Sequence, residues 1–440
     1  MKLTDLTNKD IFPNLKYRFS KVTQQNNNTI ILERDFMGEN SLHYYIDTQS
    51  QEVIVANSLR DIKRYTENKS GKFLWEHSRA VSNNKKVTIT PDTFYNARPE
   101  IVELQPTLQK MSQPSVNVND MKEAGAALKK ELVESIRERI ATISDKTIGI
   151  LLSGGLDSIT IGYYLKKNSR GKQIRAFTLK VNENDADISK SREIARQLGI
   201  PLTEVKVSKK NDAVSVDVEV YDAKRNLEHR YHLSTENINS LVTKVLEIAE
   251  NPKKDNLFCS LAMYLIGQAV KKEGIKTVFC GEGPNEMIND YGFTPPKEGY
   301  PEMGISSTYF RQALTFGLKE SDAQLGRGGL AKHALSRMGK MFAYYGIRLE
   351  SPFFNKKIAN ILTRIPYADG DYGIIKPQID NFILGPDGQK ILGSLEGVSK
   401  EKFQDGSGIS RVFKKYTQEN LIGMFQKIYG VNKTSYIKSR

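Results

Sequence analysis

Apolar residues follow two different spacings along the chain, and the spacing changes near residue 120. In the first hundred residues, short β-branched and aromatic runs are separated by clusters of Gly, Asn, Asp and Gln, a pattern typical of strands. The clearest runs are 29–32, 42–47 and 52–56. From Met121 to Ile140 an apolar residue recurs every fourth position, which predicts an amphipathic helix. Residues 101–120 carry Pro, Ser and Asn with little periodicity, and we interpret this stretch as an interdomain linker.

Strand-like and helix-like segments alternate after residue 147. The predicted strands are 148–152, 174–181, 202–207 and 277–280, and the predicted helices are 159–167, 188–198 and 257–272. A charged insertion, 208–256, interrupts the series, and residues 303–440 are predicted to be mostly helical. This alternation predicts an α/β fold with a doubly wound parallel sheet, which binds ligands at the carboxyl ends of its strands. The predicted domains are a β-rich domain at 1–110 and an α/β domain at 121–440, with the linker at 111–120.

The chain is basic, with 65 Lys and Arg against 51 Asp and Glu, a formal charge of +14. Residues 411–440 hold seven basic residues and one acidic residue. Such a surface attracts nucleic acid or another anionic partner. A solvated basic surface also explains the charge, and no zinc-finger or RNA-recognition signature is present. Phe425 and Tyr429 in this stretch follow a helical spacing that core packing also explains.

No segment of the sequence predicts a membrane-bound or secreted protein. No apolar run reaches the ~18–20 residues of a membrane span, and the first ten residues lack the apolar segment of a signal peptide. The two cysteines, Cys259 and Cys280, have neither metal-ligand spacing nor a disulfide framework. We therefore expect a cytoplasmic protein with reduced thiols, and the sequence leaves a homo-oligomer open.

The first predicted strand of the α/β region runs directly into a glycine turn. The residues of the turn and of the helix start are Ser153, Gly154, Gly155, Leu156, Asp157 and Ser158. A strand, a tight turn and a helix N-terminus present backbone N–H groups to an anion, and glycines let a phosphate approach the backbone closely. Asp157 beside a phosphate implies a magnesium ion between them. An ordinary strand–turn–helix remains the alternative. The Walker pattern is absent, and the six residues resemble the pyrophosphate loop of the ATP pyrophosphatases, which cleave ATP between the α and β phosphates.

A second motif, 280–286, follows the last predicted strand and reads Cys-Gly-Glu-Gly-Pro-Asn-Glu. With the first loop it resembles the asparagine synthetase family, whose synthetase domain carries SGGLDS and then SGEGxDE. Three further stretches are similar to family motifs in the same order: 175–199 with the adenine-side strand and helix, 345–355 with GxExRxPFLD, and 400–408 with KExFxDGxG. The resemblance covers about 121–410.

The resemblance implies an ATP-dependent ligase. A substrate carboxylate attacks the α-phosphate of ATP, pyrophosphate leaves, and an amine displaces AMP to give an amide. Loop 153–158, Thr178 and Gly281 would bind ATP, and Asp157 and Asn285 would bind Mg²⁺. Lys400 would neutralise developing negative charge, and Glu282 would act at the reacting centre. A surface lysine and an ordinary strand-end carboxylate are the alternatives for these last two residues.

Three positions depart from the family pattern. Asn285 replaces the second magnesium aspartate, so metal affinity falls unless Asp185, Asp187 or Glu286 compensates. Arg348 and Glu350 exchange the acidic and basic positions of the family, which could preserve an ion pair with reversed polarity, and Asn355 replaces an aspartate. These changes favour a second hypothesis, a non-catalytic ATP-binding or scaffold descendant. A third hypothesis, a nucleic-acid or nucleotide-modifying amidating enzyme, rests on the basic charge.

Residues 31–62 resemble the back half of the family's class II glutaminase domain, here truncated, although an unrelated small β-domain remains an alternative. A glutaminase of this class needs Cys directly after the initiator Met, whereas residue 2 is Lys. We therefore expect no glutamine hydrolysis, as in β-lactam synthetases and lasso-peptide cyclases, which lack this cysteine and use an amine of the substrate. The expected partners are small-molecule or peptide carboxylates and amines.

Overall fold

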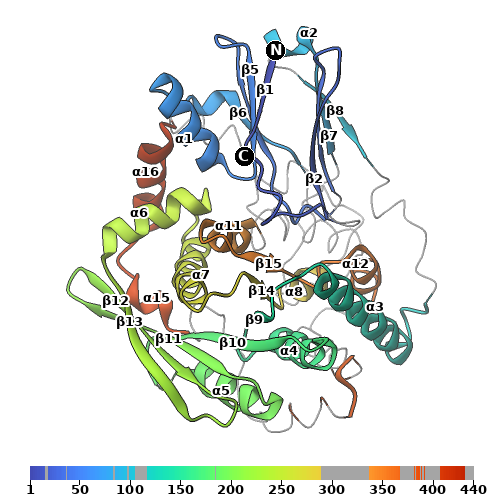
Figure 1. Cartoon of the computed structure of the whole chain (residues 1–440), viewed down its shortest axis with the longest axis vertical. Helices are drawn as coiled ribbons and strands as arrows, with labels where there is room; N and C mark the ends of the chain where they lie inside the picture. The colour runs from blue at the N-terminus through green and yellow to red at the C-terminus, as the bar shows by residue number, and fades with distance from the viewer. Residues whose placement is uncertain are drawn as a thin grey trace.

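The computed structural model has two parts stacked along the long axis of the molecule (Figure 1). The described residues are 1–14, 18–35, 37–82, 85–96, 99–104, 116–183, 185–288, 336–366, 381, 383–386, 388, 391 and 407–431. We call residues up to 104 the N-terminal part and residues from 116 onward the C-terminal part. No helix in these ranges is both long and apolar enough to cross a membrane.

Two four-stranded sheets make up the N-terminal part. The first has the order β1 (Lys2–Asp5), β5 (Glu52–Ala56), β4 (His43–Asp47), β6 (Ser78–Ala80), and the second has the order β2 (Ser20–Gln24), β3 (Ile30–Arg34), β7 (Lys85–Ile89), β8 (Glu100–Glu103). One apolar cluster joins both sheets and includes Leu32 and Val87 from one and Tyr44 and Val53 from the other. The two sheets therefore pack face to face as a sandwich. This arrangement confirms the three strands predicted near 29–32, 42–47 and 52–56.

Three short helical segments accompany these sheets: α1 (Leu59–Ser70), the 3₁₀ turn Trp75–His77 and α2 (Pro91–Tyr95). The β8 strand pairs with β7, so the start of the stretch predicted as a linker is a strand of the sandwich. Residues 105–115 of that stretch lie outside the described residues.

A seven-stranded sheet forms the centre of the C-terminal part, in the order β13-β12-β11-β10-β9-β14-β15. Its parallel strands are β9 (Thr147–Leu151), β10 (Gln173–Lys180), β11 (Leu202–Lys210), β14 (Thr277–Phe279) and β15 (Arg348–Glu350). The chain runs outward from β9 through β10 to β11 and then returns to the other side of β9 to form β14 and β15. The strand order therefore reverses between β9 and β14, which confirms the predicted doubly wound sheet and fixes its switch point.

Helices cover both faces of this sheet. On one face lie α4 (Leu156–Asn168) and α5 (Ala186–Leu198), flanked by α3 (Met121–Ala141), and on the other lies α7 (Lys254–Lys272) (Figure 1). These four helices confirm the four predicted from apolar spacing. The described residues also form α6 (Ile238–Ala249), α8 (Pro284–Ile288), α11 (Ser336–Tyr344), α12 (Lys356–Leu362), α15 (Ile409–Val412) and α16 (Gln418–Tyr429).

The charged insertion contains regular structure that the sequence interpretation missed. Strands β12 (Ala213–Tyr221) and β13 (Leu227–Asn237) extend the sheet as antiparallel strands. The signal was present, because Val214, Val216, Val218 and Val220 alternate with polar residues and all four are buried. Strand β15 also interrupts the region predicted as mostly helical.

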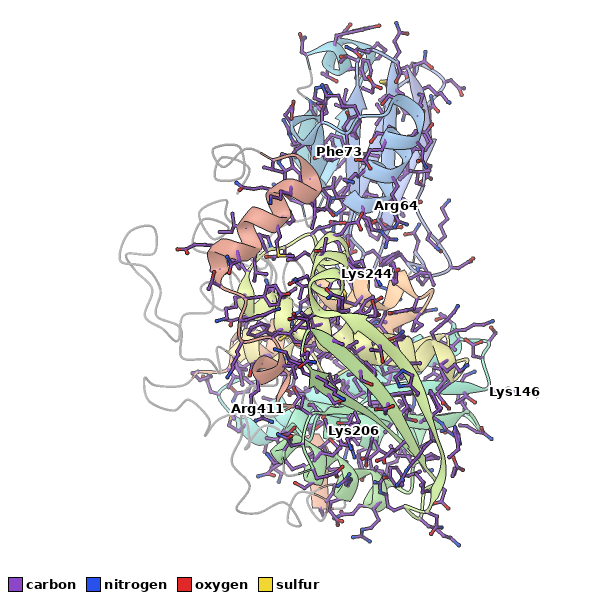
Figure 2. The ribbon with its side chains drawn as sticks, turned by 90° about the vertical axis from the view of Figure 1, so that its left-hand side faces the viewer. Arg64, Phe73, Lys146, Lys206, Lys244 and Arg411 are labelled. Carbon is purple, nitrogen blue, oxygen red and sulfur yellow. The ribbon has the colours of Figure 1, made fainter. Side chains whose placement is uncertain are left out.

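The C-terminal helix joins the two parts. Phe425 and Tyr429 of α16 are buried against Trp75 and Phe73 of the N-terminal part, with ring centroids 5.8 Å apart for Trp75–Phe425 and 6.4 Å apart for Phe73–Tyr429. Figure 2 shows Phe73 close to the upper end of this helix. The helical spacing of Phe425 and Tyr429 is therefore explained by packing.

Candidate active site

The loop between β9 and α4 lies at the switch point of the sheet. Gly154 has φ +76°, in the left-handed region that only glycine adopts readily. Gly155 is the N-cap of α4 and has no side chain to cap the helix, so backbone N–H groups of the first turn can receive an anion. The hydroxyl of Ser158 donates to the Gly155 carbonyl at 2.8 Å, which holds the turn closed from within.

Gly281, which follows β14, packs against the backbone of this loop. A Cβ at Gly281 would lie 2.6 Å from the carbonyl carbon of Asp157 and 2.7 Å from the backbone nitrogen of Ser158. Only glycine permits so close an approach of two main chains. The contact places Glu282, the next residue along the chain, beside the helix start that carries Asp157. The two motifs that were read separately from the sequence therefore meet in space.

The residues after Gly281 turn sharply into a short helix. Gly283 has φ +132° and is buried, and Pro284 begins α8. Glu282, Asn285 and Glu286 are half-buried on this turn and helix. Together with Asp157 they offer carboxylate and amide oxygens, the donors that Mg²⁺ prefers, and magnesium sites on phosphates often use only one or two carboxylates. These donor types fit the ion. Among the residues described, no group of three His, Cys, Asp or Glu residues that could hold a metal ion occurs, and magnesium binding by Asp157 and Asn285 stays a prediction.

Thr178 supports the loop from the neighbouring strand. It lies in β10 and is 4% exposed. Its hydroxyl donates to Ser191 at 3.3 Å, and the Ser191 hydroxyl donates to the carbonyl of Leu152 at 2.8 Å. The side chain thus fixes the end of β9 where the loop begins, and a direct contact between Thr178 and a nucleotide stays a prediction.

Asp185 has another role than the metal binding considered from the sequence. One of its oxygens accepts from the backbone N–H groups of Val181 and Asn182, at 3.0 and 2.8 Å. The other accepts from the Arg411 guanidinium. These contacts tie α15 to the segment that follows β10. The side chain of Asp187 and all of Lys400 lie outside the described residues, so their predicted roles stay predictions.

The exchanged pair Arg348 and Glu350 does form an ion pair. Glu350 is fully buried and also contacts Arg18 of the N-terminal part, at 2.9 Å, and Arg139 of α3. Burial by itself would raise the pKa of Glu350, but the three guanidinium groups outweigh it and lower the pKa to about 2. The reversed polarity therefore sits inside a larger ionic cluster, in which Glu39 of the N-terminal part is a fifth member.

Two other positions have structural explanations. The Asn355 side chain caps α12 by accepting from the Lys357 N–H at 2.8 Å, and Asn and Asp are equally good N-caps. Cys280 is buried, and its sulfur lies 2.9 Å from the Ser351 hydroxyl. Burial, together with nearby Glu282, raises the pKa of the Cys280 thiol to about 12, so the thiolate form is disfavoured at neutral pH.

Sequence reasoning did not identify Arg18, Glu39 or Arg139 as neighbours of the site. All three converge on the end of β15, next to the chain that carries Cys280 and Glu282. No local sequence pattern indicates these residues, because their partner is distant in the sequence. Glu350 is 211 residues from Arg139 and 332 residues from Arg18.

Comparison with solved structures gives matches of low overall agreement. A U34-tRNA thiolase of Methanococcus maripaludis has a TM-score of 0.30 at 13% identity, covering 74% of this chain and 86% of that one. An NAD⁺ synthetase of Burkholderia pseudomallei has a TM-score of 0.24 at 14% identity, covering 70% and 97%. The fold assignment accordingly depends on the strand order described above.

Comparison by sequence is more specific. Residues 127–321 match the family model described as asparagine synthase. The chain is 26% identical over 309 residues to asparagine synthetase B [glutamine-hydrolyzing] of Escherichia coli K12, and 22% identical over 300 residues to the asparagine synthetase [glutamine-hydrolyzing] of Sandersonia aurantiaca. These matches cover 67% and 64% of this chain but 46% and 48% of the relatives, so the chain spans about half their length. Residues 127–321 are thus similar to the synthetase domain of the asparagine synthetase family.

Proposed function

We propose that this chain is an ATP-dependent ligase that adenylates a substrate carboxylate, releases pyrophosphate and joins the acyl group to an amine. The observation that carries the proposal is the backbone contact between Gly281 and the 153–158 loop. It brings a phosphate-accepting helix start and a carboxylate-bearing turn together at the switch point, where α/β sheets bind ligands. The similarity to asparagine synthetases supports the same reaction class.

The residues of the chain would act mainly by position and charge. Backbone N–H groups at the start of α4 would hold the phosphates of ATP. Asp157 and Asn285 would hold Mg²⁺, which supplies neutralisation of the phosphate charge when bound. Glu282, next to this helix start, would orient the acyl group or the amine. Lys400 would neutralise charge developing on the phosphates, a role taken from its motif alone.

We further propose that the amine does not come from glutamine hydrolysed by this chain. Lys2 is the first residue of β1, with its side chain 68% exposed. Both cysteines of the sequence, Cys259 and Cys280, belong to the C-terminal part. The N-terminal part, proposed as a domain at 1–110, thus offers no thiol in this chain, and the amine would be ammonia, a second substrate or a group of the same molecule.

A non-catalytic descendant is the second candidate, and Asn285 is the observation that favours it. The other two departures no longer support it, because Asn355 is a helix cap and Arg348 pairs with Glu350. Magnesium-dependent binding of ATP distinguishes the two candidates. An active ligase binds ATP together with Mg²⁺, whereas a decayed site is expected to show no ATP binding that depends on Mg²⁺.

The test combines calorimetry of ATP binding, with and without Mg²⁺, and ATP–pyrophosphate exchange with panels of carboxylic acids and amines. We expect Asp157→Ala to abolish magnesium-dependent binding and exchange. The matched control is Asp255→Ala, because Asp255 is an exposed acidic residue in the first turn of α7. Wild-type protein that binds no ATP with Mg²⁺, or that equals Asp157→Ala in both assays, overturns the proposal.

A further inference from the structure

The end of β15 is held from two directions by residues of the N-terminal part. Arg18 donates to both carboxylate oxygens of Glu350, at 2.9 and 3.1 Å, and to the carbonyl of Leu349 at 3.3 Å. Glu39 accepts from Arg18 at 2.9 Å and, through a longer bond of 3.4 Å, from the backbone N–H of Ser351. The side chains of Arg18, Glu39 and Glu350 are 4%, 7% and 0% exposed, so water screens these contacts little.

The same end of β15 contacts the start of the Glu282 loop through two bonds. The Cys280 N–H donates to the Glu350 carbonyl at 2.9 Å, and the Cys280 sulfur lies 2.9 Å from the Ser351 hydroxyl. Glu282 is two residues beyond Cys280. A continuous set of buried contacts therefore runs from Arg18 and Glu39, through Glu350 and Ser351, to Cys280.

We infer that Arg18 and Glu39 of the N-terminal part are positioning residues for the Glu282 loop, acting through Glu350, Ser351 and Cys280. The inference rests on the proposed function for its catalytic consequence but not for the coupling itself. The N-terminal part would then have a structural role and no catalytic one. It would fix the end of β15 so that Gly281 and Glu282 lie against the start of α4.

The charges of this ionic cluster explain why removing one of its side chains affects the positions of the others. The cluster holds three guanidinium groups and two carboxylates, all buried. The cluster already carries one positive charge in excess, and taking away a carboxylate raises the excess to two, which is costly and drives the remaining groups to rearrange or admit water. Because Glu350 uses its main-chain carbonyl to hold Cys280, such a rearrangement moves the loop that begins there.

Labelling of the Cys280 thiol tests the coupling without any substrate. In a Cys259→Ser background Cys280 is the single thiol, and burial keeps its reactivity with iodoacetamide low. We expect Glu39→Gln to raise the labelling rate by about tenfold, in proportion to the more frequent opening of the β15 end. The matched control is Glu250→Gln, which removes another buried carboxylate at the junction between the two parts.

Glu250 accepts from the backbone N–H groups of Leu59 and Arg60 at the start of α1 and pairs with Lys340. Among the described residues it makes no hydrogen bond or ion pair with β15. Glu250→Gln is therefore expected to destabilise the junction without exposing Cys280. Equal labelling rates for both variants would mean general loosening and would overturn the inference, as would a Glu39→Gln rate equal to that of the parent.

The catalytic consequence is tested with Ser351→Ala, which removes the side-chain contact with Cys280 but leaves the main-chain bond from Cys280 to Glu350 and the ionic cluster intact. We expect kcat for amide formation to fall by about tenfold or more, because small displacements of a reacting group are costly, while KM for ATP changes by less than about twofold. Ser260→Ala is the control for loss of one buried hydroxyl. The Ser260 hydroxyl is buried and donates to the carbonyl of Asn256 within α7.

The two tests separate the coupling from the reaction. A Ser351→Ala enzyme with unchanged kcat, or with kcat lowered no more than by Ser260→Ala, overturns the catalytic consequence. If wild-type protein has no ligase activity but Glu39→Gln still exposes Cys280 selectively, the proposed function fails and the coupling stands.

Discussion

Gly281 lies so close to Asp157 that a methyl group on it would overlap the Asp157 carbonyl, at 2.6 Å from its carbon. The contact joins two loops that are separated by more than a hundred residues in the sequence. It sets how near the turn carrying Glu282 can come to the start of α4. The geometry of the candidate site thus depends on the absence of one Cβ atom.

Gly281→Ala should separate these loops. Because the overlapping atoms belong to the main chain, the clash is relieved only by moving one loop, and a shift of about 1 Å costs on the order of 10²-fold in rate. We expect a corresponding loss of kcat/KM in ATP–pyrophosphate exchange. Gly423→Ala is the control: nothing lies within 4 Å of the new Cβ on α16, and unfolding free energy should rise by about 0.5–1 kcal/mol. Unchanged exchange by Gly281→Ala would contradict the prediction.

Glu204 should make the stability of the C-terminal part dependent on acidic pH. Burial acts to raise the pKa of this carboxyl group, but bonds from Arg192, Lys180 and Arg225 outweigh it and lower the pKa to about 2. A depressed pKa in the folded state contributes stability above the ordinary value of about 4.5, and this contribution is lost as pH falls through about 2. The shift corresponds to on the order of 3 kcal/mol.

Urea unfolding between pH 6 and pH 2 measures this contribution. We expect the free energy of unfolding of Glu204→Gln to be lower than that of wild type at pH 6 and to approach it toward pH 2. Glu193→Gln is the control. Hydrogen bonds from Arg196 and Gln197 lower the pKa of Glu193 to about 2 as well, but both partners of the Glu193–Arg196 pair are partly exposed, and solvent screening leaves such pairs little effect on stability. A constant difference across the whole pH range would show that Glu204 acts through packing and not through its charge.

The parts of the fold that the sequence predicted are those specified by local patterns. Loop 153–158 could be placed because an apolar strand, two glycines and a helix start are contiguous, and the reversal of strand order followed from the alternation of strands and helices. The contact of Arg18 with Glu350 could not be predicted, because any of 65 basic residues could pair with that carboxylate. Strand β12 was not predicted for another reason. The charged residues in and around it favoured an irregular insertion, although its valines alternate strictly with polar residues.

The chain should release no glutamate from glutamine, with or without ATP and Mg²⁺. The reason is chemical, since amide hydrolysis of this type needs a nucleophilic thiol, the N-terminal part of this chain contains no cysteine, and burial raises the pKa of the Cys280 thiol to about 12. The measurement is glutamate release by purified protein against a heat-inactivated control. Release above that control, retained in a Cys259→Ser variant, would contradict the prediction.

Asn285→Asp should strengthen magnesium binding at the candidate site. An amide oxygen can ligate Mg²⁺ but brings no charge, whereas the number of charged ligands sets affinity for such hard cations. Asn285 is half-buried in the first turn of α8, four residues beyond Gly281, so a carboxylate fits in the same space. We expect the Mg²⁺ concentration for half-maximal ATP binding to fall by roughly tenfold, measured by calorimetry at fixed ATP.

Asn119→Asp serves as the matched control. Asn119 is exposed in the segment before α3, so this substitution adds the same negative charge away from the site. The two variants together separate a local ligand from a general electrostatic effect, which would act on both. An unchanged Mg²⁺ dependence in Asn285→Asp would remove Asn285 from the metal site and leave Asp157 as the predicted protein ligand. A gain in exchange activity alongside tighter binding would mean that the amide at this position, and not loss of the fold, limits the reaction.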